Sequence, residues 1–215
     1  DLHRVDRRQR QMCIRDRCIP NWMDSLASES TYDLSSKRLI TVGRFAPEKG
    51  YDLLAQVAKQ VLPKYPDWQW DIYGAGSSAI KSALQNELAE AGVEHQVNLK
   101  GVVLGTENIY PGHSIYVLPS RFEGFGLVLL EAKQYGLPVV SFNCPTGPAD
   151  IVIDSVNGYL VAPYDIDDMS DKISLLIEQE SKRRYFSDRA MLDTEKFQKD
   201  TIMNQWDHLV HKFCP

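Results

Sequence analysis

Cysteine is scarce in this sequence, and that scarcity excludes two classes of protein. The four cysteines, at positions 13, 18, 144 and 214, lack the paired spacing of a metal site and are too few for a disulfide scaffold. The five histidines are not spaced as metal ligands either. We therefore expect a protein of the reducing cytosol, and the sequence offers no candidate metal ligand.

Long apolar runs are also missing. The longest, GLVLLEA at residues 126–132, already contains a glutamate, and no run approaches the roughly 20 residues that a membrane-spanning helix needs. The hydrophobic content of 43% is ordinary for a globular protein. A chain of 215 residues fits one large domain, or one domain with appendages.

Basic residues are in deficit over most of the chain, although its first segment hides this. Residues 1–17 carry six Arg and three Asp, which leaves 18 basic and 26 acidic residues in the rest, a net charge of −8. This balance argues against nucleic acid as a partner. Residues 1–17 have neither the apolar centre of a signal peptide nor the acid-poor composition of a transit peptide. We expect this Arg-rich head to be spurious or disordered.

Short apolar segments rich in branched residues alternate with segments of helical spacing over most of the chain. The first kind predicts six strands and the second predicts five helices. Strands are expected at 37–43, 68–74, 95–101, 114–120, 137–143 and 159–163, and helices at 50–65, 77–92, 126–136, 146–152 and 165–179. Gly92 is expected to end the second helix and Thr146 to cap the fourth.

This alternation predicts an α/β fold, a Rossmann-like three-layer α/β/α domain with a six-stranded parallel sheet. Residues 181–215 are charged and have a helical pattern. Parallel sheets of this kind bind ligands beyond the carboxyl ends of their strands, so the loops after the strands are the places to look for chemistry.

The loop after the first strand, GRFAPEKGYD, contains two cations. Arg44 ends the strand, and Lys49 lies at the start of the next helix. Two cations beside a helix N-terminus with free backbone N–H groups make a natural phosphate site. The alternative is ordinary solubilising surface charge.

The loop after the second strand, IYGAGSSA, matches the G-x-G-x-x-A dinucleotide fingerprint at Gly74, Gly76 and Ala79. That fingerprint normally follows the first strand, and an acidic residue should end the next one. Here the next strand ends at Lys100. A tight strand-to-helix turn therefore explains the glycines better than an NAD site does, and an NAD-dependent oxidoreductase remains as an alternative.

The loop after the fourth strand, SRFEGFGLVLLEA, places Glu123 before Gly124 and Gly126, with Glu131 about one and a half turns into the next helix. The glycines let the backbone approach a ligand and expose amides at the helix start. Two carboxylates around a nest of amides suit a polyhydroxy ligand with a phosphate between its ends. In the alternative interpretation Glu131 is a solvated helix residue and Glu123 a partner of the helix dipole.

Three segments together resemble the C-terminal half of family-4 glycosyltransferases, the group 1 set with GT-B architecture. They are GRFAPEKGYDLL at 43–54, VLPSRFEGFGLVLLEAKQYGLPVVSFNCPTGPADIV at 117–152 and NGYLVAPYD at 157–165. The resemblance runs from about Lys37 to Leu176, and it includes the family's hallmark of two glutamates separated by seven residues around Gly-Phe-Gly.

The resemblance implies a retaining, metal-independent transfer of a hexose-type sugar from a nucleoside-diphosphate sugar. By analogy we expect a UDP-sugar donor and a glycan or lipid-linked acceptor in bacterial surface polysaccharide synthesis. Arg44 and Lys49 would grip the diphosphate, and Glu123 would bind hydroxyls of the sugar, so these three are the expected catalytic residues. Glu131 would take the ribose hydroxyls. The other expected donor-binding residues are Gly43, Gly124, Phe125, Gly126 and Leu127.

The resemblance also implies a domain organisation. Residues 18–36 would be the remnant of an interdomain linker, 37–180 the nucleotide-sugar-binding domain and 181–215 the C-terminal helices. The N-terminal, acceptor-binding half of the GT-B fold would be missing, so the isolated fragment is expected to be inactive. We expect a cytoplasmic enzyme, with peripheral association at the inner membrane face as an option for the full-length protein. The alternative is a truncated, non-catalytic nucleotide-sugar-binding module.

Four further residues are expected to be structural. The sequence GHSIY stands where the family often has Ala-Asp, and we expect His113 to affect packing only. Cys144 is expected to be a packed free thiol. The pair of tryptophans around the second strand, Trp68 and Trp70, is expected to serve the core.

Overall fold

The computed structural model describes residues 19–23 and 32–213. The Arg-rich head and part of the expected linker lie outside the described residues. The chain divides into two units, residues 25–195 and residues 1–24 together with 196–215, and each is described by itself.

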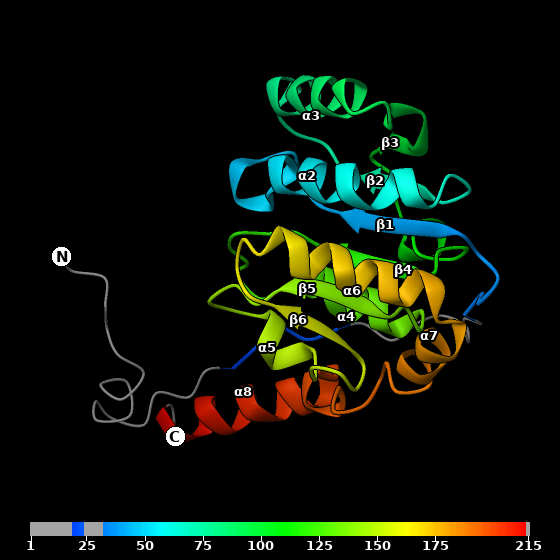
Figure 1. The fold of residues 1–215 in the computed structure, drawn as a ribbon. Coiled ribbons are helices and arrows are strands. Elements are labelled where there is room, and N and C mark those ends of the chain that lie inside the picture. The colour runs from blue at the N-terminus through cyan, green and yellow to red at the C-terminus, as the bar shows by residue number, and fades with distance from the viewer. Residues whose placement is uncertain (1–18, 24–31, 214–215) are drawn as a thin grey trace. The chain divides into compact units, whose positions relative to one another are not determined.

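Residues 25–195 form a six-stranded sheet in which every neighbouring pair of strands is parallel (Figure 1). The order is β3-β2-β1-β4-β5-β6, so the direction of winding reverses between β1 and β4. The six predicted strands are confirmed, each slightly shorter than its sequence segment. Their bounds are β1 Arg38–Val42, β2 Gln69–Tyr73, β3 Val97–Gly101, β4 Ile115–Leu118, β5 Val139–Phe142 and β6 Gly158–Val161.

Helices cover both faces of the sheet, which makes the predicted three layers. On one face α2 (Tyr51–Val61) packs against both α3 (Ser78–Glu90) and α6 (Ile166–Glu178). Because parallel crossovers are right-handed, the reversal of winding puts α4 (Leu127–Gln134) and α5 (Pro148–Ile151) on the other face. The short helix α7 (Glu180–Ser187) follows and contacts α6.

Short 3-10 turns occur within the connections. They are η1 Pro47–Lys49, η2 Leu62–Lys64, η3 Glu94–Gln96, η4 Thr106–Asn108 and η5 Glu195–Phe197. The α3 helix stops at its C-cap Ala91, and Gly92 follows with φ 71°, the left-handed conformation that glycine adopts most readily. Gly92 therefore ends the second helix as predicted.

The larger core lies between the sheet and the face that α2, α3 and α6 cover. Apolar residues of α2 recur at helical spacing and are buried, among them Leu54, Val57, Ala58 and Val61. Trp68 and Trp70 belong to the same cluster, and the Trp70 indole donates a hydrogen bond to Thr41 Oγ1 at 3.1 Å. The structural role expected for the two tryptophans is confirmed.

The predicted cap of the fourth helix is wrong. The N-cap of α5 is Gly147, with no side-chain cap, and Pro148 is the first helical residue. The Thr146 hydroxyl instead donates to the backbone carbonyl of Glu123 in the loop after β4. A tertiary hydrogen bond between neighbouring loops has taken the place of the local one that the sequence pattern suggested.

In the second unit, the described residues are 19–23 and 196–213. The backbone N–H of Met23 donates to the carbonyl of Phe197 at 2.9 Å, and α8 (Lys199–Phe213) follows. Four large apolar side chains in this unit are exposed: Trp22, Met203, Trp206 and Val210. Within the described residues, no helix combines the length and the apolar character required to cross a bilayer.

Candidate functional site

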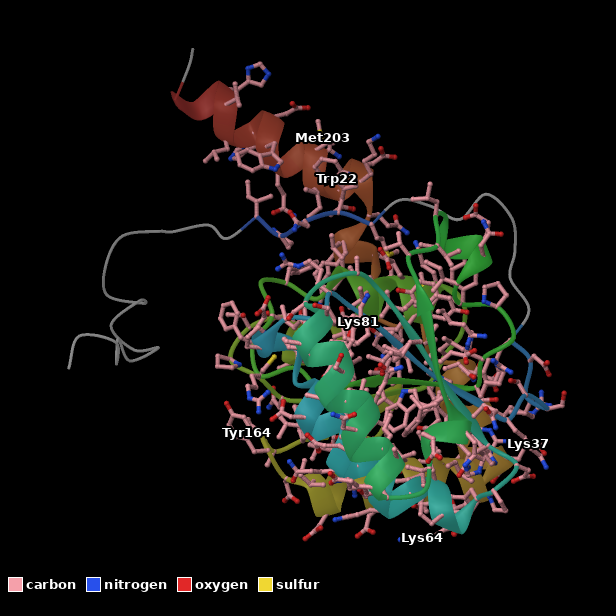
Figure 2. The ribbon with its side chains drawn as sticks, turned by 90° about the horizontal axis from the view of Figure 1, so that it is seen from above. Trp22, Lys37, Lys64, Lys81, Tyr164 and Met203 are labelled. Atoms are coloured by element: carbon pink, nitrogen blue, oxygen red, sulfur yellow. The ribbon has the colours of Figure 1, made fainter. Side chains whose placement is uncertain are left out.

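The candidate site lies at the edge of the sheet where the parallel strands end. Tyr164, in the loop after β6, marks this carboxyl edge, and Lys37, just before β1, marks the opposite one (Figure 2). At the carboxyl edge the loops after β2, β1, β4 and β5 contact each other in the same order as their strands. The site is built from these four loops.

The loops after β2 and β1 are joined by backbone hydrogen bonds. The N–H of Phe45 donates to the carbonyl of Ala75 at 2.7 Å. A Cβ at Gly74 would lie 1.9 Å from the carbonyl oxygen of Gly43, and one at Gly76 would lie 2.5 Å from that of Phe45. Both glycines of the G-x-G pattern are therefore required by the contact between two loops, which accounts for them without a dinucleotide.

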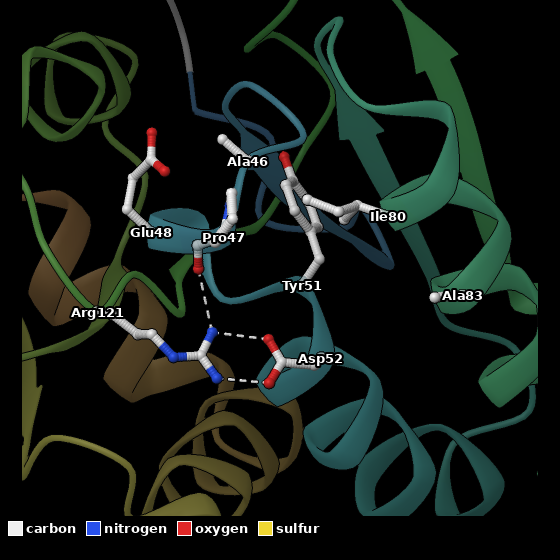
Figure 3. Close-up of a pocket in the computed structure, with 8 residues that line it drawn as sticks. All are labelled: Ala46, Pro47, Glu48, Tyr51, Asp52, Ile80, Ala83 and Arg121. Carbon is white, nitrogen blue, oxygen red and sulfur yellow. Dashed lines mark hydrogen bonds and ion pairs between the residues drawn. The ribbon is translucent and has the colours of Figure 1, made fainter.

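The loop after β1 is joined in turn to the loop after β4. The N–H of Arg121 donates to the carbonyl of Glu48 at 2.8 Å. The Arg121 guanidinium also donates two hydrogen bonds to the Asp52 carboxylate, one of them from Nη1 to Oδ1 at 2.7 Å (Figure 3). The same Nη1 donates to the Pro47 carbonyl at 3.2 Å. The hydrogen bond from Arg121 lowers the pKa of Asp52. These contacts fix η1, which carries Lys49.

A cavity of about 570 Å³ lies beside this junction, on the side facing α3 (Figure 3). Its walls are largely apolar and include the Arg121–Asp52 ion pair. The lining residues are Ala46, Pro47, Glu48, Tyr51, Asp52, Ile80, Ala83 and Arg121. Neither Lys49 nor Glu123 lines it, so the cavity is separate from the predicted site residues.

The loops after β4 and β5 also touch each other. Besides the Thr146 hydrogen bond to Glu123, a Cβ at Gly147 would lie 2.1 Å from the carbonyl oxygen of Phe125, and Gly147 has φ 95°. Because Gly147 has no side chain, the loop after β5 can pack directly against the backbone of the Gly-Phe-Gly turn. This role of Gly147 could not be predicted from the sequence, because the support comes from a loop 22 residues further along the chain.

Lys49 and Glu123 form an ion pair at the centre of this arrangement. Lys49 Nζ lies 2.7 and 2.8 Å from the two carboxylate oxygens of Glu123. Only 18% of the Lys49 side chain and 6% of the Glu123 side chain are exposed. Arg44 is not part of this pair: its side chain is 77% exposed and binds Glu48 at 3.1 Å. The structure thus brings two of the three predicted catalytic residues together.

The predicted donor-binding residues lie around the start of α4. Gly126 is the N-cap of this helix, with φ 89°, and Leu127 is its first residue and is partly exposed. Gly124 has open space where a Cβ would be. Gly43 lies across the edge, at the end of β1, where its carbonyl accepts a hydrogen bond from the Tyr51 hydroxyl at 2.7 Å.

Glu131 lies further into α4 and is half-buried. The Tyr110 hydroxyl donates to its Oε2 at 2.6 Å. In β4, burial first and the charges of Glu123 and Glu131 next hold the pKa of the fully buried Tyr116 well above its ordinary value. The charges of both carboxylates therefore act on the same buried phenol. Neither tyrosine was predicted as a site residue; the signal that could have found them is their position in and before the strand that leads to Glu123.

A second polar cluster, away from these loops, was also missed. Asp71 in β2 is buried and accepts hydrogen bonds from Arg38 Nε at 3.0 Å and Asn98 Nδ2 at 2.9 Å, while His113 Nε2 lies 3.1 Å away. Burial acts to raise the pKa of Asp71, but hydrogen bonds with His113, Arg38 and Asn98 outweigh it and lower the pKa to about 2. The packing role expected for His113 includes this contact.

Metal ligands are not grouped in the described part of the chain: no cluster of three or more His, Cys, Asp or Glu there could hold an ion. Cys144 is a buried free thiol, as expected, and its Sγ lies 3.7 Å from the Thr146 carbonyl. Burial, reinforced by the charge of Glu123, raises the pKa of this thiol. Cys144 therefore packs beside the loop after β4.

The family described as "Glycosyl transferases group 1" matches residues 25–192. The poly(ribitol-phosphate) alpha-N-acetylglucosaminyltransferase of Staphylococcus aureus is 32% identical over 169 residues, which are 78% of this chain and 34% of that enzyme. The chain spans about half the length, or less, of the curated relatives that it matches.

Two solved structures are similar. The C-terminal domain of a glycosyl transferase group 1 family protein (LpcC) from Francisella tularensis has a TM-score of 0.66 and 27% identity, over 80% of this chain and 87% of that one. The pneumococcal O-GlcNAc transferase GtfA, in complex with UDP and GlcNAc, has a TM-score of 0.76 and 30% identity, over 87% of this chain and 38% of that one.

Proposed function

The chain belongs to the group 1 glycosyltransferases, and on that basis we propose that residues 37–180 bind a nucleoside-diphosphate sugar, with UDP-sugar as the donor. The full-length enzyme would transfer a hexose-type sugar, with retention, to a glycan or lipid-linked acceptor in surface polysaccharide synthesis. Residues 18–36 would be the linker to an acceptor-binding half, and residues 181–215 the closing helices of the GT-B fold.

The observation that carries this proposal is the Lys49–Glu123 pair beside the start of α4. A diphosphate at this position would accept hydrogen bonds from Lys49 Nζ and from the free amides around Gly126 and Leu127. Glu123 would accept hydrogen bonds from the hydroxyls of the sugar, and Glu131, deeper in α4, those of the ribose. The GtfA complex with UDP and GlcNAc supports the choice of donor class.

The geometry suits the proposed chemistry. When the bond between sugar and phosphate breaks, negative charge develops on the diphosphate and positive charge on the sugar ring. Fixed amides and the Lys49 ammonium would stabilise the first, and the Glu123 carboxylate would lie close to the second. Arg44 is exposed, and in the described part of the chain its side chain pairs with Glu48 alone, so it is able to turn toward a bound diphosphate. No metal is needed for this charge balance.

Calorimetric titration with UDP, GDP, ADP and NAD in the presence of EDTA tests the proposal. We expect one nucleoside diphosphate to bind, and Lys49→Met to weaken it by about 1.5–3 kcal/mol, the value of a charged hydrogen bond. Lys37→Met is the matched control, because Lys37 is an exposed lysine at the other edge of the sheet (Figure 2).

Binding of no nucleoside diphosphate, or equal affinity in the wild type and Lys49→Met, would contradict the proposed donor site. Thermal unfolding of each variant separates loss of binding from loss of fold. Tight binding of NAD that does not depend on Glu131 would instead favour the oxidoreductase alternative. Transfer by the chain joined to an acceptor-binding half would separate an enzyme from a non-catalytic binding module.

A further inference from the structure

We propose that Tyr110 is a positioning residue that sets Glu131 to accept hydrogen bonds from the ribose hydroxyls of the donor. This inference rests on the proposed function, and it assigns a role to a residue outside the expected site. If Tyr110 positions Glu131 in this way, the hydrogen bond between them underlies the preference of the site for a ribonucleotide over its deoxy analogues.

Tyr110 is held rigidly. It follows η4, its backbone N–H donates to the Thr106 carbonyl at 3.1 Å, and its side chain is fully buried. Its ring stacks on Tyr135 with 5.4 Å between centroids and 15° between planes. The Tyr135 hydroxyl in turn lies 3.0 Å from Thr106 Oγ1. The Tyr110 hydroxyl therefore has a fixed position from which to hold a flexible side chain.

Glu131 is the flexible side chain that this hydroxyl holds. It is half-buried, and its carboxylate would otherwise sample several rotamers, because α4 constrains only its first torsion. The 2.6 Å hydrogen bond from Tyr110 to Oε2 selects one of them. Among the described residues, no side chain donates a hydrogen bond to Glu131 Oε1. That oxygen is thus presented to a ligand in a defined direction.

The direction of the hydrogen bond is also fixed. Burial, together with the negative charge of nearby Glu131, raises the pKa of Tyr110 well above its ordinary value, so the phenol stays protonated. A protonated phenol donates to the carboxylate, and the carboxylate remains an acceptor. A ligand that fits Glu131 must therefore bring hydroxyl donors, as a ribose diol does. A deoxy analogue brings one donor fewer.

The test is Tyr110→Phe, which removes only the hydroxyl. Because Glu131 is only partly buried, water can replace the lost donor, and we expect the variant to fold. Tyr135→Phe is the matched control: it belongs to the same ring stack, but its hydroxyl meets Thr106 rather than the carboxylate. Both variants and the wild type are titrated calorimetrically with UDP, 2′-deoxy-UDP and 3′-deoxy-UDP, and their thermal unfolding is compared.

We expect the wild type to prefer UDP over at least one deoxy analogue. Tyr110→Phe should bind UDP about 3- to 10-fold more weakly, as for one hydrogen bond, and lose most of that preference. Tyr135→Phe should keep it. In a Glu131→Ala background, Tyr110→Phe should have no further effect, because the two residues act through one contact.

The outcomes separate this inference from the proposed function. A wild type that binds UDP, with Tyr110→Phe keeping the full preference over the deoxy analogues, overturns the role of Tyr110 alone. A wild type that binds UDP without any such preference also overturns it. A wild type that binds no UDP overturns the proposed function as well. Equal loss of preference in Tyr135→Phe, which keeps the ring and loses only the hydroxyl beside Thr106, would overturn the specific role of the hydrogen bond between Tyr110 and Glu131.

Discussion

Replacing Asp71 with Asn removes the charge at the centre of the buried cluster in β2 while keeping the size of the side chain. The carboxylate is 2% exposed and lies within hydrogen-bonding distance of Arg38, Asn98 and His113. The Asp71→Asn variant leaves the positive charge of Arg38 without its partner and weakens each of the three contacts. We therefore expect the free energy of unfolding to fall.

The magnitude follows from the pKa of Asp71, which is lowered from 3.8 to about 2 in the folded protein. At about 1.4 kcal/mol for each pKa unit, the charged form contributes about 2 kcal/mol at neutral pH. Because the pKa in the folded state is the lower one, this contribution is complete well above pH 3.8 and is lost as the pH falls through 2. At pH 3 about 1 kcal/mol should remain.

The assay is urea unfolding of the wild type and Asp71→Asn at pH 7, 4 and 3, followed by tryptophan fluorescence. Trp70 is adjacent to Asp71 and fully buried, so its emission reports on β2. We expect a difference of about 2 kcal/mol at pH 7 and 4 that shrinks at pH 3. Asp67→Asn is the control, because Asp67 forms an exposed pair with Lys37 and should matter little. A difference that is negligible at pH 7, or that stays constant down to pH 3, would refute the reasoning.

Two further substitutions test the loops themselves. Glu123→Gln releases Lys49 Nζ from a carboxylate that it now contacts through both oxygens, so we expect UDP to bind roughly 3- to 10-fold more tightly while the UDP-sugar gains nothing. Calorimetry with the two ligands measures this, and weaker UDP binding by the variant would contradict it. Gly147→Ala places a Cβ 2.1 Å from the Phe125 carbonyl oxygen at φ 95°, so we expect a loss of about 1–3 kcal/mol in urea unfolding and weaker UDP binding. Gly124→Ala, which has open space around its Cβ, is the control for stability, and an equal loss in the free energy of unfolding for both substitutions would show that the contact with Phe125 is unimportant.

The strands and helices could be predicted because each depends on local pattern. The six strands are short and apolar, and the sheet that they form is covered on both faces, so continuous branched runs identified them. Thr146 was misassigned because a capping residue and a residue that bonds a neighbouring loop look alike in sequence. Only the adjacency of β4 and β5 in the sheet decides between these two uses.

The site was predicted in part for the same reason. The motif around Glu123 and the cations of the first loop stand out as residue types in loops. The pairing of Lys49 with Glu123 cannot be recognised in the sequence, because the two residues are 74 positions apart. They meet because β1 and β4 are neighbours in the sheet. The Asp71 cluster needs the register of three segments: Asp71 pairs with Asn98 across β2 and β3, and His113 arrives from the connection before β4. The alignment of these segments with one another cannot be predicted from the sequence pattern of any one of them.

Each pair of neighbouring loops in the candidate site is joined by at least one contact that involves only peptide groups or glycines. Phe45 bonds Ala75 through the backbone, Arg121 bonds Glu48 through the backbone, and Gly147 abuts the carbonyl of Phe125. Exposed side chains on the same loops, such as Phe122, can therefore be replaced without changing the backbone contacts between the loops. Substitutions at exposed loop positions would thus alter ligand preference while Lys49 and Glu123 keep their places. A library that randomises exposed loop positions and spares the glycines would exploit this separation.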